Sequence, residues 1–135
     1  MLRLSGNLFC RTRQAVTQLS DTDQRRALDL GLDDWTWLYE LAFWLGPDEE
    51  TIDLPDLVPG AQHVLIQLLD DGLAEVATLD RQTGEYAVLD AVPARRVVED
   101  PESWRTAEDL VERGSGVLFA YGVTNAGRGA LFGAP

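Results

Sequence analysis

The chain has 135 residues, 45% of them hydrophobic, and a formal net charge of −12. This length and apolar content predict one domain with its own core, spanning residues 1–135, and argue against a disordered protein. The charge is far from the basic balance that is typical of nucleic-acid-binding proteins. There is one cysteine, Cys10, and no apolar run approaches the roughly 18 residues of a membrane span. We therefore expect a soluble, cytoplasmic protein without disulfides and without membrane contacts.

Charge is distributed in blocks along the chain. Residues 1–26 hold five arginines against two aspartates, and residues 27–80 hold thirteen acidic side chains and no basic one. All basic residues are arginine, and the chain has no lysine. A continuous acidic block attracts cationic partners and repels phosphate. Charge alone therefore favours a basic protein partner over a nucleic acid.

The N-terminal third is predicted to be helical. Residues 7–30 have apolar side chains near one helix face, and Ser20–Asp23 offers a cap for a second short helix that ends before Gly31. A further helix is predicted from Asp33 to Leu45, with acidic residues in its first turn and Gly46-Pro47 as its stop.

The stretch "PGAQHVLIQLLDDGLAEV", residues 59–76, is predicted to be a helix, a glycine stop and a strand. A short helix near Pro55–Val58 and a turn at Pro59-Gly60 are expected before it. Apolar residues from position 61 onward recur at i, i+3, i+4, i+7 and i+8, so one helix face points inward.

Alternating apolar and polar residues then indicate two strands joined by the turn "DRQTG", with Arg81 at its tip. The elements expected from here to the end are strands at 73–79 and 85–92, helices at 93–98 and 106–114, a strand at 116–124, and a short helix or coil at 125–133.

The order of elements across residues 33–92 resembles the winged helix-turn-helix domain of bacterial regulators. "VLIQLLDDGLAEV" looks like the passage from recognition helix to wing, and "YGVTNAGRGAL" is similar to the "LTxxGxxxL" passage after the wing in MarR-like and PadR-like regulators. The second motif places Thr124, Gly127 and Leu131. About thirty residues separate it from the predicted hairpin, which is a departure from the family pattern.

The resemblance implies an α+β, winged-helix-like fold, with helices packed on a small antiparallel hairpin or three-stranded sheet. Residues 33–92 would form its core, residues 1–32 an N-terminal helical extension, and residues 93–135 a C-terminal extension of helix and strand.

The resemblance also places DNA contacts on the exposed face of the helix at 61–70 and on the wing. These residues would be Gln62, His63, Ile66, Gln67, Asp70 and Arg81. Glutamine and histidine can read base edges. However, the helix lacks the phosphate-binding cations that supply most of the affinity for DNA.

Catalytic signatures are weak in this sequence. His63 is the only histidine, and Cys10 has no base beside it in the sequence. Neither a Cys/His cluster at metal spacing nor a phosphate-binding glycine-rich loop is present. The acidic stretch "PDEETIDLPD" lacks the alternating spacing and central glycine of a calcium loop. We expect no enzymatic activity, no cofactor and no metal.

The helix predicted at 33–45 is apolar nearly all round, which indicates burial on several sides. Either its stripe of Trp37, Leu41 and Trp44 is covered within the monomer, or this stripe faces a dimer mate or another partner, since aromatic residues anchor interfaces. The predicted protein interface combines this stripe with the acidic loop and consists of Trp37, Leu41, Trp44, Asp48, Glu49, Glu50, Asp53 and Asp56.

Two functions remain open from the sequence. The first is a non-catalytic protein-binding module that presents its acidic surface to a basic partner, as an immunity-type or DNA-mimicking protein would. The alternative is a winged-helix transcriptional regulator that binds DNA. In the alternative, the scattered arginines would have to converge on one DNA-facing side, for which we expect a dimer.

Overall fold

The computed structural model describes residues 22–46, 53–114 and 116–132. In chain order the elements are α1 (Thr22–Leu30), β2 (Thr36–Trp37), α2 (Leu38–Leu45), α3 (Leu54–Asp70), β3 (Ala74–Asp80), β4 (Tyr86–Val88), α4 (Ala91–Glu99), the 3-10 helix η2 (Pro101–Trp104), α5 (Ala107–Glu112), β5 (Val117–Val123) and α6 (Asn125–Phe132).

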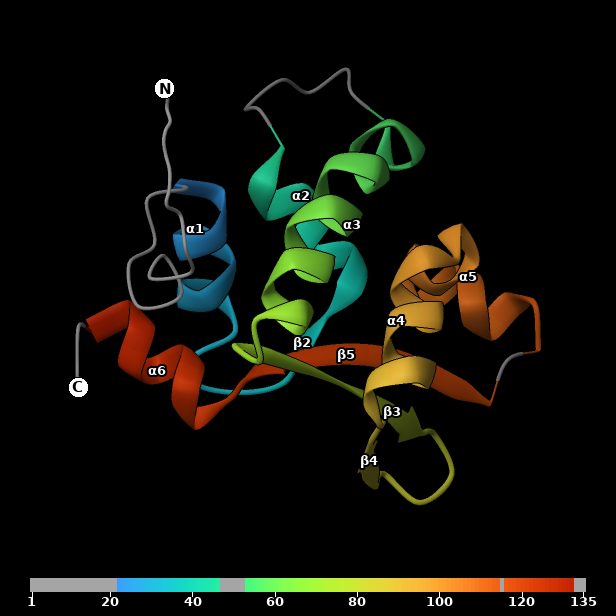
Figure 1. Cartoon of the computed structure of the whole chain (residues 1–135). Helices are drawn as coiled ribbons and strands as arrows, with labels where there is room; N and C mark the ends of the chain where they lie inside the picture. The colour runs from blue at the N-terminus through green and yellow to red at the C-terminus, as the bar shows by residue number, and fades with distance from the viewer. Residues whose placement is uncertain (1–21, 47–52, 115, 133–135) are drawn as a thin grey trace.

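The protein has an α+β fold, as predicted. The four strands in the described residues form one antiparallel sheet in the order β2-β5-β3-β4, which is larger than the expected hairpin or three-stranded sheet. Figure 1 shows α1 to α5 on one side of this sheet and α6 beside its end. Within the described residues, no helix is long and apolar enough to cross a membrane.

The helix predicted from Asp33 begins only at Leu38. Thr36 and Trp37 pair instead with Tyr121 and Ala120 of β5 and form β2. Hydrogen bonding to a distant strand thus replaces the first turn of the predicted helix, and Glu40 caps the shortened α2 by accepting a hydrogen bond from the backbone N–H of Trp37 at 3.1 Å. The helix predicted before Thr22 lies outside the described residues.

A single helix, α3, replaces the predicted short helix, turn and helix. Pro59 lies inside α3 and leaves one backbone carbonyl of the previous turn without its helical donor. Pro55, four residues earlier, is exposed, so water can solvate that carbonyl. On the opposite side of α3, Val58 and Ala61 are buried in the core, and their burial favours a continuous helix across the proline.

The predicted hairpin is present as β3 and β4, although β4 is shorter than expected. The Asp80 carboxylate accepts hydrogen bonds from the backbone N–H groups of Gln82 and Thr83, and Gly84 has a φ of 73° that suits glycine. The second strand stops at Val88 because Asp90 already precedes α4. The helices predicted at 93–98 and 106–114 are confirmed as α4 and α5, and the segment predicted as a short helix or coil forms the helix α6.

β5 is one of the two inner strands of the sheet and lies beside β3, although it follows β3 only after the whole α4–α5 segment. It pairs with β3 from Val117 to Val123 and with β2 on its other side. Its Tyr121 is fully buried, and the tyrosine hydroxyl donates a 2.6 Å hydrogen bond to the carbonyl of Ala27 in α1. Burial in the core raises the pKa of Tyr121, so this hydroxyl keeps its proton.

α6 is held against the start of β3 by the motif that resembles the regulator family. The Thr124 hydroxyl donates to the carbonyl of Gly72 at 2.7 Å and accepts from the N–H of Gly127 at 3.0 Å. A side chain at Gly127 would place its Cβ 2.1 Å from the carbonyl oxygen of Leu73. Glycine is therefore required there by close backbone contact, and Leu131 follows in the core.

The substitution Gly127→Ala tests this contact. Because backbone atoms of Leu73 must move, we expect the free energy of unfolding to fall by about 1–3 kcal/mol. Urea denaturation measures the change. The matched control is Gly60→Ala inside α3, where a Cβ would meet nothing within 4 Å. This variant should gain about 0.5–1 kcal/mol, and an equal loss in both variants would contradict the explanation.

Candidate functional site

The two faces of the sheet differ in what covers them. Side chains alternate between faces along a strand, so the register assigns each residue to a side. Ala74, Val76 and Tyr121 point toward the helices and belong to the main core. The opposite side, here called the outer face, consists of Trp37, Glu75, Ala77, Leu79, Tyr86, Val88, Leu118, Ala120 and Gly122.

Aromatic rings lie flat on the middle of the outer face. A Cβ built on Gly122 would come within 3.0 Å of the Trp35 ring, so this ring lies directly over Gly122. The Trp35 ring stacks on that of Tyr86, with centroids 5.3 Å apart and planes at 16°. Small residues in the central strands make room for the rings, and Ala77 and Ala120 are completely buried beneath this layer.

The outer face remains apolar and partly exposed in the described structure. Tyr86 is 41% exposed and Val88 is 54% exposed, whereas Trp35 and Trp37 are half-buried. Figure 1 shows no described helix on this side of the sheet. Exposed aromatic and apolar side chains gathered on one surface are typical of interaction sites.

Acidic side chains border the outer face. Asp33 and Asp34 precede Trp35, Glu75 lies on the face itself, and Glu85 and Asp90 flank β4. Two cations lie on the same border. Arg128 donates a 2.7 Å hydrogen bond to the carbonyl of Leu32, and Arg81 is exposed in the turn after β3. The border therefore carries more negative than positive charge.

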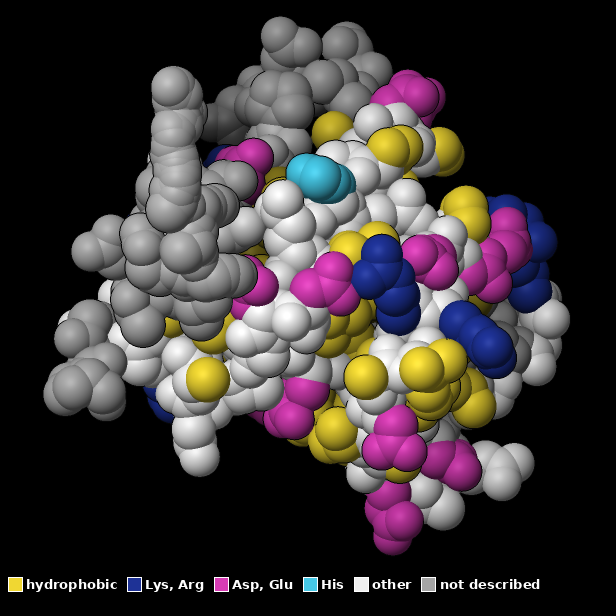
Figure 2. Space-filling model, viewed as in Figure 1, with side chains coloured by type: hydrophobic (Ala, Val, Ile, Leu, Met, Phe, Trp, Pro, Cys, Tyr) yellow, Lys and Arg dark blue, Asp and Glu magenta, His cyan; other side chains and the backbone are white. Residues whose placement is uncertain are grey.

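Most described arginines have partners inside the protein. Arg26 lies 5.7 Å from the centre of the Trp44 ring, and Arg95 binds Asp70 at 2.8 Å and Glu99 at 3.1 Å. Figure 2 shows dark blue arginines beside magenta carboxylates on the helix-bearing side. Among the described arginines, only Arg81 and Arg96 have no side-chain hydrogen bond or ion pair.

Many carboxylates, in contrast, have no cation beside them. The described acidic side chains without a hydrogen bond or ion pair are Asp29, Asp33, Asp53, Asp56, Asp71, Glu75, Glu85, Asp90, Glu108 and Glu112. They outnumber the unpartnered arginines by a wide margin. The surface that the described residues offer to a partner is thus acidic.

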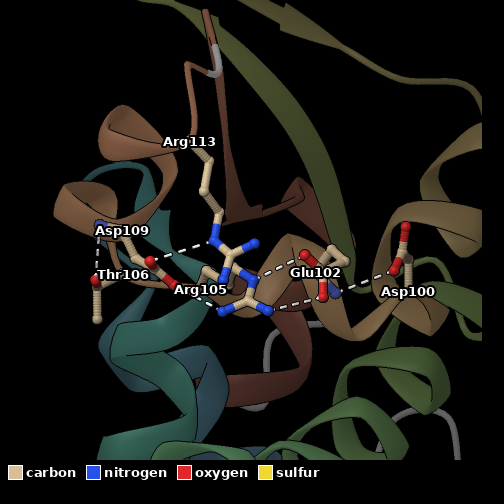
Figure 3. A network of polar contacts seen from close by, with 6 residues as sticks. All are labelled: Asp100, Glu102, Arg105, Thr106, Asp109 and Arg113. Atoms are coloured by element: carbon tan, nitrogen blue, oxygen red, sulfur yellow. Dashed lines mark hydrogen bonds and ion pairs between the residues drawn. The ribbon is translucent and has the colours of Figure 1, made fainter.

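The largest ion-pair network stabilises the η2–α5 corner (Figure 3). Arg105 binds both carboxylate oxygens of Glu102, at 2.8 and 3.0 Å, and one oxygen of Asp109 at 2.8 Å. Arg113 binds the other Asp109 oxygen at 3.3 Å, and the Thr106 hydroxyl caps α5. Hydrogen bonds from Arg105 hold the pKa of the Glu102 and Asp109 carboxyls below their ordinary values.

A groove of about 400 Å³ lies between this corner and the start of α3. Its walls are largely apolar and include Leu54, Val58 and Pro59, with Arg105 at its edge. The three nitrogen donors of Arg105 are already bound to carboxylates. No group of three or more potential metal-ligating side chains was found among the described residues.

The predicted stripe of Trp37, Leu41 and Trp44 does not form one surface. Trp37 lies on the outer face, Leu41 is completely buried in the core, and Trp44 contacts α1. The Trp44 indole donates a 3.2 Å hydrogen bond to the carbonyl of Arg26 and remains 46% exposed. Of the two alternatives for this stripe, burial within the monomer or contact with a partner, the first therefore holds for Leu41.

The acidic part of the predicted interface is described only in part. Asp53 and Asp56 are exposed at the beginning of α3, where the helix dipole favours negative charge. Asp48, Glu49 and Glu50 lie outside the described residues, as does Cys10.

Two of the predicted DNA-contacting residues make hydrogen bonds within the fold. The Gln62 amide donates to the carbonyls of Val98 at 2.9 Å and Glu99 at 3.1 Å, and Gln67 accepts from Gln24 at 2.8 Å. His63 is exposed on α3, and Arg81 is exposed in the β3–β4 turn. Gln62 is thus hydrogen-bonded to α4, and Gln67 is hydrogen-bonded to α1.

Asp70 and Ile66, the other residues of that predicted helix face, also have neighbours. Asp70 is bound by Arg95 of α4, and Ile66 packs against the core.

Comparisons with protein-family models, with curated proteins and with solved structures found no match to this chain. The assignment of a function therefore depends on the geometry and charge described above.

The outer face was not predicted from the sequence. The sequence predicts Trp35 inside the helix at 33–45, and Tyr86 and Val88 only as residues of the strand at 85–92. The alternation of "EYAVLD" contains part of the signal, since it puts Tyr86 and Val88 on one side of a strand. Which side lies away from the helices depends on pairing with β5, which local patterns do not reveal.

The stacking of Trp35 on Tyr86 can be measured in a double-mutant cycle of Trp35→Leu and Tyr86→Leu. We expect a coupling free energy of about 0.5–1.5 kcal/mol in urea unfolding, beyond the area that each ring buries. The control pair is Trp44→Leu with Tyr86→Leu, whose rings are not paired in the structure. Coupling near zero for the first cycle would contradict the stacked arrangement.

The Arg105 network should make stability dependent on pH in the acid range. Because the folded-state pKa of Glu102 and Asp109 is lowered, their contribution is complete above the ordinary carboxyl range and is lost as pH falls through the lowered values. The melting temperature of Arg105→Gln should lie below that of the parent at pH 7, and the difference should shrink toward pH 3. Arg96→Gln, which removes an unpartnered arginine, should show no such convergence.

Proposed function

We propose that the protein is a non-catalytic binding module whose acidic surface takes a basic protein partner, with the outer face of the sheet as its contact. The observation that carries this proposal is the imbalance in available charge. Unpartnered carboxylates are numerous among the described residues, whereas Arg81 and Arg96 are the unpartnered arginines there. A cationic surface would be attracted over a long range and then contact the apolar face.

The arrangement of the outer face agrees with the anatomy of protein interfaces. Such interfaces have an apolar, aromatic centre and a polar rim, and a few large side chains supply most of the affinity. Here Trp35, Trp37 and Tyr86 would be the central residues, with Glu85 and Asp90 on the rim. A second copy of this chain would meet the same acidic rim, so charge disfavours a homodimer through this face.

The winged-helix resemblance remains part of the proposal at the level of the fold. If β5 is the second wing strand, Thr124 follows the wing directly, as in the regulator motif. Residues 81–116, including β4, α4 and α5, would then be an insertion in the wing, which accounts for the additional residues before Thr124.

The DNA-binding alternative receives less support from the same geometry. Gln62 and Gln67 already make hydrogen bonds to other elements, and the exposed residues of α3 include aspartates but no cation. DNA binding needs several phosphate contacts from arginine or lysine. Of the described arginines, Arg81 and Arg96 could supply such contacts without first losing an internal partner.

Site-specific photo-crosslinking in the native host tests the proposed function. A benzophenone amino acid is incorporated at Val88 on the outer face and, as the matched control, at Val111 on α5, which is 40% exposed. We expect one discrete adduct at Val88, formed with a positively charged segment of another protein, and none at Val111. The adduct should disappear at about 0.5 M salt, where the Debye length is roughly 4 Å.

Three results would contradict the proposal. These are equal labelling at both positions, an adduct only with a second copy of the chain, and an adduct with nucleic acid. A mobility-shift assay with DNA from the protein's own upstream region completes the test. We expect no shift even at low salt, whereas a salt-sensitive shift that Arg81→Ala and Arg96→Ala abolish would establish the DNA-binding alternative.

A further inference from the structure

β4 forms one edge of the sheet, so only part of its backbone N–H and C=O groups can form hydrogen bonds to a neighbouring strand. In an antiparallel pair, residues alternate between those that exchange hydrogen bonds and those that do not. Asp80 donates to Glu85 at 3.0 Å, and Leu89 donates to Val76 at 2.8 Å. In this register Ala87 faces β3, and the N–H and C=O groups of Tyr86 and Val88 point away from the sheet.

These outward groups have no hydrogen-bond partner within the described protein. No backbone hydrogen bond to another element involves Tyr86 or Val88, and all three residues of β4 are exposed. Edge strands are commonly protected by their shortness, by proline, by a bulge or by charged side chains. β4 is short, with three residues, but "EYAVLD" contains neither proline nor lysine, and its charges, Glu85 and Asp90, flank the strand rather than interrupt it.

We propose that an extended segment of the partner adds to the sheet along β4. This inference rests on the proposed function and specifies how the basic partner binds. The N–H and C=O groups of Tyr86 and Val88 would pair with the backbone of the segment, as in other cases of strand addition. Side chains on one side of the added strand would continue the apolar outer face beside Tyr86 and Val88.

Charge decides which extended segment fits. Arginine or lysine side chains at the ends of the added strand would lie near Glu85 and Asp90, neither of which has a cation beside it. A second copy of β4 fits poorly, because an antiparallel pair centred on Ala87 would gather Glu85 of one copy and Asp90 of the other at each end of the pair, with no cation from β4 between them. The occupant is therefore a partner segment that alternates apolar and basic residues.

The experiment uses the full chain, labelled with ¹⁵N, and a short synthetic peptide that alternates valine and arginine. Before peptide is added, the amides of Tyr86 and Val88 should exchange rapidly with solvent, while that of Ala87 is protected. Addition of peptide at low salt should slow exchange at Tyr86 and Val88 by at least about tenfold. A peptide that alternates valine and glutamate should have no effect.

Two variants at one position separate backbone pairing from side-chain contact. Val88→Pro removes the outward N–H, which the β3–β4 ladder does not use, and Ala87 before it already has the extended conformation that proline requires. Val88→Ala removes most of the side chain and keeps the N–H. We expect Val88→Pro to raise the dissociation constant of the peptide about three- to tenfold relative to Val88→Ala. Circular dichroism and urea unfolding establish that both variants are folded.

The outcomes separate this inference from the proposed function. Equal peptide affinity of Val88→Pro and Val88→Ala, or binding without slower exchange at Tyr86 and Val88, overturns strand addition. The absence of any binding by the valine-arginine peptide overturns it as well. The proposed function is tested separately, by the crosslinking at Val88 and Val111, so an adduct with a basic partner at Val88 together with unchanged amide exchange would contradict strand addition alone.

Discussion

The pairing of β5 between β2 and β3 is the interaction on which the rest of the structure depends. It joins segments that are far apart in the sequence and gives the sheet two different faces. On the inner side, Tyr121 fills the core and binds the carbonyl of Ala27. On the outer side, Ala120 and Gly122 leave the space that the Trp35 ring occupies. Without β5, α1 would lose its hydrogen bond to Tyr121, and the Trp35 ring would lose the surface at Gly122 on which it packs.

Ion pairs within the protein determine which charged side chains remain available to a partner. Arg95 and Arg105 each bind two carboxylates, so they connect elements of the fold and contribute little positive field outside it. Exposed pairs of this kind add modestly to stability, and salt screens them. Their larger consequence here is a negative surface charge, because the carboxylates that have no arginine beside them include those bordering the outer face.

The proposed mode of binding follows from the same two features. The outer face offers apolar area, and the free edge of β4 offers backbone donors and acceptors next to it. Apolar area without the edge would favour any hydrophobic partner, and an edge without charge would favour another copy of the chain. In the proposed mode of binding, Glu85 and Asp90 beside β4 would restrict the choice to a basic, extended segment and so add specificity to affinity.

The sequence by itself determined the elements whose signals are local. The helical apolar period in the second part of α3 and the turn residues before Gly84 were sufficient to predict those elements, and composition determined the acidic charge. Tertiary structure decided the rest. Hydrogen bonding to β5 made Thr36 and Trp37 a strand instead of a helix turn, and core packing kept α3 continuous through Pro59. The residues of the predicted stripe, Trp37, Leu41 and Trp44, lie in different places for the same reason. Only the position of each residue relative to β5 and the core decides that Trp37 lies on the outer face while Leu41 is buried, and those contacts join residues distant in sequence.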